Sequence, residues 1–206
     1  MSLNQNLLDF RASIRQQNRH IGFAHNTDVD GNYTVEQDLR EFISESAYLR
    51  IFVSWETFLE RSFIDYLVNE QSIDNKRPAK WVSPIDIDHA NNIIIGNQKH
   101  MDWSNPEAVR KISKLFFHLG YVFDSVLSSI NADLLDMKTI RNSAAHISST
   151  TTTKLDGIAS RILGTTMSNV SSYQILFAND PRDTSKTVLE RYLSLIDVAA
   201  EQIAKG

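Results

Sequence analysis

Apolar residues recur along most of the chain with the period of an amphipathic helix. Leu3, Leu7, Phe10 and Ile14 step by four, three and four residues, so one face of a first helix is expected to be buried. The same spacing returns near the C-terminus, where we expect a last helix from about 184 to 203. The pattern therefore predicts helices at both ends of the chain.

The longest helix is expected over residues 34–70, which contain neither proline nor glycine. At 1.5 Å per residue it would be on the order of 50 Å long. Apolar residues cover much of its circumference, so it should lie centrally. Thr34 is expected to cap its N-terminus, with Gln37 reaching back. The preceding stretch, NTDVDGNYTVEQ, also has the look of a calcium loop, but Gln37 stands where a bidentate glutamate is needed.

Residues 71–104 are expected to form an irregular connector or insertion, because Pro78 and Pro84 break helices and a short apolar run ends at Gly96. After it, Asn105 should cap a helix that ends at Gly120 in the left-handed conformation. The later segments are expected to be a helix over about 128–145, a polar loop over 148–154, and a weakly patterned stretch over 155–183 with a short helix ending at Gly164.

These elements predict an all-α fold, an up-and-down bundle of about five or six helices around the very long central helix at 34–70. A chain of 206 residues fits one domain, so residues 1–206 are expected to form a single helical domain with an insertion at about 71–104.

Composition narrows the function. The chain has no cysteine, which excludes disulfides and thiolate metal sites and suits a cytoplasmic protein. No apolar run approaches the roughly 18 to 20 residues of a membrane span, and no signal peptide is evident. The formal net charge of −4 means that nucleic acid would have to bind a local basic patch. Arg11, Arg15 and Arg19, spaced by four, are the candidate RNA-binding stripe, or else a solvated outer face.

Two glutamates interrupt the apolar face of the central helix. At about 100° per residue, Glu45 and Glu56 fall in one stripe with Leu49 and Phe52. A core carboxylate needs a partner or takes up a proton. We expect an arginine or histidine beside one of them, Arg141 being the favoured candidate, either as a structural ion pair or as support for a site.

The stretch TIRNSAAHISS places Arg141, Asn142 and His146 within six positions, separated by small residues. Asn142 and His146 are four apart and share a face of a helix. Small residues between them would let another strand approach closely. Such a histidine can be structural, or it can transfer protons near neutral pH while the arginine holds an anion.

Four segments together resemble the HEPN superfamily, most closely the RiboL-PSP-HEPN-like stand-alone proteins. They are ESAYLRIFVSWETFLERSFIDYL, NPEAVRKISKLFFHLG, RNSAAHIS and TVLERYLSLIDVAAEQIA, and they span most of residues 35–204.

The resemblance implies a metal-independent endoribonuclease with no cofactor, in a toxin–antitoxin or anti-phage defence setting. It implies that Arg141, Asn142 and His146 are catalytic and that a homodimer brings two motifs together. Glu45 and Glu56, singled out by their place on the central helix, are the candidates to support them. RNA would be the substrate and an antitoxin or operon partner a further ligand, with no metal and no membrane. The alternative is a non-catalytic HEPN-like interaction module.

Overall fold

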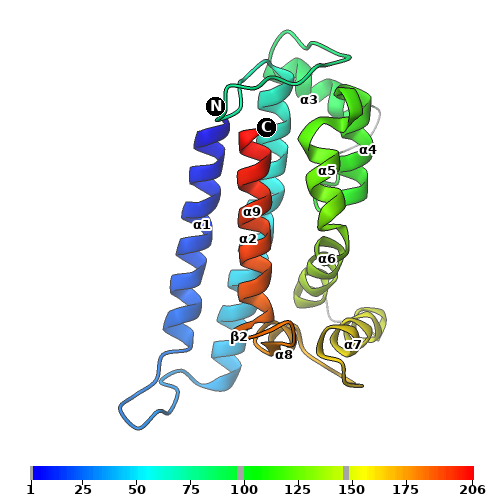
Figure 1. The fold of residues 1–206 in the computed structure, drawn as a ribbon. Helices are drawn as coiled ribbons and strands as arrows, with labels where there is room; N and C mark the ends of the chain where they lie inside the picture. Colours follow the sequence, from blue (N-terminus) through cyan, green and yellow to red (C-terminus); the bar gives the residue numbers. More distant parts are fainter. Residues whose placement is uncertain (1, 97–99, 146–148) are drawn as a thin grey trace. The chain divides into compact units, whose positions relative to one another are not determined.

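The computed structural model describes residues 2–96, 100–145 and 149–206, and it is all-α as expected (Figure 1). Within these ranges lie nine α-helices, one 3-10 turn and a two-stranded antiparallel hairpin. The elements are α1 Leu3–Ala24, α2 Gln37–Leu67, α3 Ile87–Ile95, α4 Pro106–Phe116, η1 His118–Gly120, α5 Tyr121–Ser129, α6 Asn131–Ala145, α7 Ser149–Leu163, α8 Ser172–Leu176, β1 Asn179–Asp180, β2 Asp183–Thr187 and α9 Val188–Lys205.

The chain packs as two compact units, each assembled from distant stretches of sequence. Unit 1 comprises Met1–Arg11, Ser54–Leu135 and Leu195–Gly206, and unit 2 comprises Ala12–Val53 and Asp136–Ser194. Helices α1, α2, α6 and α9 each contribute one part to unit 1 and another to unit 2.

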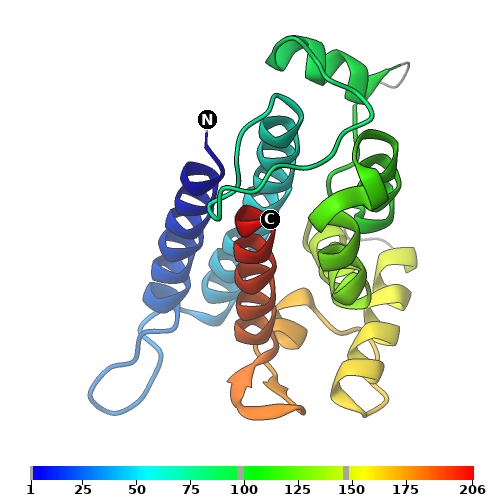
Figure 2. The same ribbon diagram turned by 45° about the horizontal axis from the view of Figure 1, so that its top comes forward.

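In unit 1 the first part of α1, the second half of α2 and the end of α9 run side by side (Figures 1 and 2). The Phe10 ring lies 5.9 Å from the Trp55 ring and 5.3 Å from the Phe58 ring. The Tyr66 hydroxyl donates to the carbonyl of Ile203 at 2.7 Å. Apolar burial and a satisfied buried hydroxyl therefore join three helices from different regions of the sequence.

Helix α4 begins as its sequence predicts. The Asn105 side chain accepts from the backbone N–H groups of Glu107 and Ala108, and Pro106 occupies the first turn. The helix ends at Phe116, earlier than expected. Gly120 does adopt the left-handed conformation, with φ 74°, but it stands at the start of α5. The expected short element in the connector is α3, which ends before Gly96.

Unit 2 contains α7, α8, the hairpin and most of α6, together with parts of α1, α2 and α9. The Tyr48 hydroxyl, which is fully buried, donates to the carbonyl of Met137 at 2.9 Å and so ties α2 to α6. Helix α7 buries Leu155, Ile158 and Ala159, spaced by three and one as one face of a helix requires.

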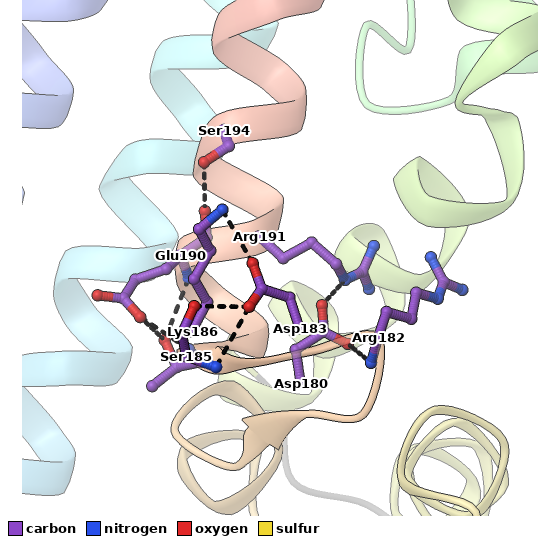
Figure 3. A network of polar contacts seen from close by, with 9 residues as sticks. Asp180, Arg182, Asp183, Ser185, Lys186, Glu190, Arg191 and Ser194 are labelled. Carbon is purple, nitrogen blue, oxygen red and sulfur yellow. Dashed lines mark hydrogen bonds and ion pairs between the residues drawn. The ribbon is translucent and has the colours of Figure 1, made fainter.

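The hairpin before α9 is held by a network of charges (Figure 3). The carboxylate of Asp180, 1% exposed, forms an ion pair with Arg191 of α9 at 2.9 Å. Thr187 and Glu190 cap the helix reciprocally: the Glu190 N–H donates to the Thr187 hydroxyl oxygen, and the Thr187 N–H donates to the Glu190 carboxylate. The cap places the start of α9 after the hairpin, a few residues later than the apolar spacing suggests.

Two local expectations were wrong. Helix α2 starts at Gln37, and Thr34 donates from its backbone N–H and its hydroxyl to the carbonyl of Asn26. Thr34 therefore closes the preceding turn and does not cap the helix. The described part of the expected loop at 148–154 belongs to α7, because burial of its apolar face outweighs the weak helix propensity of threonine.

Within the described ranges, no helix combines the length and apolar character that crossing a membrane requires.

Candidate functional site

The first two residues of the predicted motif lie in the last turn of α6. Arg141 and Asn142 are both half-buried, and a guanidinium N–H of Arg141 donates to the Asn142 side-chain oxygen at 3.1 Å. Asn142 therefore contacts the arginine of the motif. His146 lies outside the described residues.

The small residues of the motif line a cavity in unit 2. Ser143 and Ala144 form one part of a hollow of about 280 Å³, and Glu45 of α2 faces the same space. The rest of the lining comes from the start of α7 and from the segment before α8. It consists of Thr151, Thr152, Leu155, Asn169, Val170, Ser171 and Ser172.

Among the residues that the structure describes, the cavity lining is rich in hydroxyl groups and includes one ionisable carboxyl, that of Glu45. Ser143 donates from its hydroxyl to the carbonyl of Thr151 at 3.5 Å, which fastens the end of α6 to α7. Ser172 donates likewise to the carbonyl of Ile140 at 3.5 Å. These bonds hold two walls of the cavity to α6, at Ser143 and at Ile140.

Glu45 is the charged group of the cavity lining. Its Oε1 accepts from the backbone N–H of Tyr173 at 3.1 Å. Burial raises the pKa of Glu45 above its usual value, although the Tyr173 hydrogen bond acts in the opposite direction and nearby Glu41 adds to the increase. Glu45 is thus poised to carry a proton more readily than an exposed glutamate.

The stripe predicted on α2 is buried in part: Phe52, Leu59 and Phe63 belong to the core, and Leu49 is half-buried. The buried face of α2 includes Tyr48, Phe52 and Trp55, whereas Glu45 and Glu56 are half-buried at its margin. Glu45 accepts a backbone N–H where an arginine or histidine was expected. Glu56 belongs to unit 1 and is not among the residues that line the cavity.

Segment 169–173 is shaped by a helix cap. Ser171 accepts from the Gln174 N–H, and the Gln174 side chain accepts from the Ser171 N–H, a complete capping box. The spacing Ser-x-x-Gln was visible in the sequence and could have identified α8. The cavity residues of α7 carried no comparable signal, because four threonines in a row favour a loop or a strand.

The arginines of α1 divide between the two units. In unit 1, Arg11 pairs with Asp197 at 2.7 Å and with Glu201 at 2.6 Å, so this guanidinium serves the packing of α1 on α9. Those hydrogen bonds raise the pKa of Arg11. Arg15 and Arg19 belong to unit 2 and are exposed.

Beside Tyr173, unit 2 holds an aromatic cluster. The imidazole of His25 stacks on Phe177 with ring centroids 4.4 Å apart, and its Nε2 lies 3.1 Å from the hydroxyl oxygen of Ser44. The guanidinium of Arg40 donates to the Tyr173 hydroxyl at 3.2 Å. Burial lowers the pKa of His25, and the charge of Arg40 lowers it further.

In the parts of the chain that the structure describes, no group of three or more histidine, aspartate or glutamate side chains is arranged to hold a metal ion. Comparisons of the chain with protein-family models, with curated proteins and with solved structures give no match.

Proposed function

We propose that this chain is a metal-independent endoribonuclease of the HEPN type, acting through Arg141, Asn142 and His146. The observation that supports it is the cavity beside the motif: Ser143 and Ala144 line it together with Glu45. At about 280 Å³, the space lies just below the range of about 300–1,000 Å³ for ligand pockets, which suits one nucleotide of a single strand.

The local charge favours a phosphate. Between residues 136 and 161 the sequence has four basic side chains and two acidic ones, although the molecule as a whole is acidic. Helices α6 and α7 together carry four basic side chains and three acidic ones, because Asp133 also lies on α6. A phosphodiester approaching the end of α6 would meet the guanidinium of Arg141.

RNA brings its own nucleophile, the 2′-hydroxyl. In the proposed reaction His146 takes the proton of that hydroxyl, whose oxygen attacks the adjacent phosphorus and displaces the 5′-oxygen of the next nucleotide. Arg141 stabilises the charge that develops on the phosphate oxygens. Asn142 holds the Arg141 guanidinium, to which it is hydrogen-bonded. The products are a 2′,3′-cyclic phosphate and a 5′-hydroxyl.

The leaving oxygen needs a proton, and a second copy of the motif would supply the donor. We therefore include a two-fold homodimer in the proposal, with residues 141–146 of each chain facing the other. Glu45 acts as a positioning residue, because it accepts the backbone N–H of Tyr173 and so holds the start of α8 at the cavity. An RNA substrate implies a cytoplasmic location, and a defence or toxin–antitoxin role follows from the HEPN resemblance.

The test uses purified protein and labelled single-stranded or transfer RNA, with and without EDTA. His146→Ala should lower the cleavage rate by about 10² to 10⁴, and Arg141→Ala by about 10² to 10³. His100→Ala, an exposed histidine of unit 1, is the matched control and should cleave normally. DNA of the same sequence should survive.

Cleavage that requires magnesium, or that survives His146→Ala, would contradict the mechanism. Light scattering that shows a monomer at micromolar concentration would contradict the paired site. A folded dimer that cleaves none of these RNAs would favour the alternative, a non-catalytic interaction module.

A further inference from the structure

Exposed apolar side chains are concentrated where α1 ends and α2 begins. Phe23, Tyr33, Leu39 and Phe42 are between 52% and 68% exposed, and Val29 is fully exposed. We refer to these five side chains, all from residues 23–42 of unit 2, as the 23–42 surface. Large exposed aromatic groups gathered in so short a stretch are typical of a protein-interaction site.

The backbone of this surface is held rigidly. Thr27 and Tyr33 form an antiparallel bridge, and the Asp28 carboxylate accepts from the backbone N–H groups of Asp30 and Asn32 at 3.0 and 2.9 Å. Gly31 has φ 82°, the left-handed conformation that lets the turn reverse. A preformed loop loses little conformational entropy when a partner binds.

Side-chain contacts also hold Tyr33 of this surface in position. The guanidinium of Arg40 lies 3.8 Å above the centre of the Tyr33 ring, and the His25 ring meets Tyr33 edge-on at 6.0 Å. Leu39 and Phe42 are three residues apart on α2 and so face the same way. Tyr33 is therefore held in place by its neighbours, and Leu39 and Phe42 project from helix backbone.

Charge restricts what can cover this surface. Residues 23–42 contain five acidic side chains, at positions 28, 30, 36, 38 and 41, and one arginine. The arginine is engaged by Tyr33, by the Tyr173 hydroxyl and by the carbonyl of Val35. RNA and anionic membranes are repelled by such a rim, and two copies of it would repel each other.

We propose that the 23–42 surface docks a protein partner that carries an apolar stripe flanked by lysine and arginine, as on a basic amphipathic helix. The apolar stripe would cover Leu39, Phe42 and the neighbouring aromatic rings. The basic rim would meet the carboxylates of Asp38 and Glu41. This docking site uses none of the residues that line the cavity at α6 and does not depend on RNA cleavage.

The experiment uses the full chain and a fluorescent leucine–lysine amphipathic peptide of about 20 residues, long enough to form a helix. A leucine–glutamate peptide of the same pattern is its matched control. The protein variants are Leu39→Ala/Phe42→Ala, the charge reversal Asp38→Lys/Glu41→Lys, and the control pair Val53→Ala/Val198→Ala, whose side chains are also exposed. Circular dichroism checks that each variant is folded.

The lysine peptide should bind, more weakly at high salt, and the glutamate peptide should not. Leu39→Ala/Phe42→Ala should weaken binding by about tenfold or more, the control pair should not, and the charge reversal should shift preference toward the glutamate peptide. Absence of binding, or equal binding of both peptides, would overturn the proposal. So would loss of self-association or of RNA binding in Leu39→Ala/Phe42→Ala, since either would assign the surface to a second copy or to RNA.

Discussion

Replacing Arg191 by methionine should destabilise the protein strongly, although the residue lies far from the predicted motif in sequence. In the native protein its guanidinium is 14% exposed and pairs at 2.9 Å with Asp180, which is 1% exposed (Figure 3). Methionine preserves most of the apolar stem but leaves the Asp180 carboxylate buried without that cation.

Breaking a buried ion pair by removing one partner costs about 3–5 kcal/mol, because the remaining charge has lost its solvent and its counter-charge. The partial exposure of Arg191 puts the expected cost near the lower end, about 3 kcal/mol. For a chain of this size 1 kcal/mol corresponds to about 2–4 °C in Tm, so Tm should fall by roughly 6–12 °C.

The assay is thermal and urea unfolding followed by circular dichroism. Lys186→Met is the matched control on the same hairpin, because the Lys186–Asp183 pair is exposed and contributes little. Asp180→Asn/Arg191→Met removes both charges while keeping an acceptor for the Arg182 N–H, which donates to Asp180 at 3.1 Å. This double variant should be more stable than Arg191→Met alone.

Two outcomes would refute the reasoning. If Arg191→Met lowered Tm no more than Lys186→Met, burial would not strengthen the pair. Asp180→Asn, measured alone, completes the comparison. If the double variant lost as much stability as Arg191→Met and Asp180→Asn lose together, the two side chains would act independently and the ion pair would carry no coupling energy.

Two further predictions concern pH. The pKa of His25 is lowered in the native protein, so its contribution to stability is present above the ordinary value of 6.5 and is lost as pH falls through 6.5 toward the native pKa. Urea unfolding at about pH 7.5 and about pH 5 should show that the free energy of unfolding falls more for wild type than for His25→Phe between the two pH values. Equal decreases would contradict this prediction. The pKa of Glu45 is raised, so its ionisation costs stability as pH rises from the ordinary value of 4.5 through the native pKa. The free energy of unfolding of Glu45→Gln should therefore rise relative to that of wild type between about pH 4 and about pH 7. If it fell relative to wild type over that range, the carboxylate would be stabilising.

The helices with the clearest apolar period could be read from the sequence. The absence of proline and glycine from 34–70 predicted α2, which runs from Gln37 to Leu67. Asn105 and Pro106 gave the start of α4, because a side-chain cap and a fixed φ act within a few residues. Such local signals require no knowledge of what lies on the other side of the helix.

Predictions from local sequence were wrong where contacts with another part of the chain determined the structure. Thr34 had the spacing of a cap, but its backbone N–H and hydroxyl donate to the carbonyl of Asn26, and α2 begins only at Gln37. Thr151 and Thr152 favour an extended loop by propensity, yet they lie on α7 because Leu155 and Ile158 are buried on the same helix. Tertiary burial contributes more free energy than the small differences in propensity.

The sequence by itself determined the all-α class and the candidate motif at the end of α6. It could not determine that Glu45, Ser143, Thr151 and Asn169 line one cavity, because these residues meet only after α2, α6 and α7 pack together. Nor could it give the partner of Glu45, a backbone N–H of Tyr173 that is 128 residues away. Apolar period and caps operate over one or two turns of helix, whereas a site is set by contacts between segments that only the folded chain brings together.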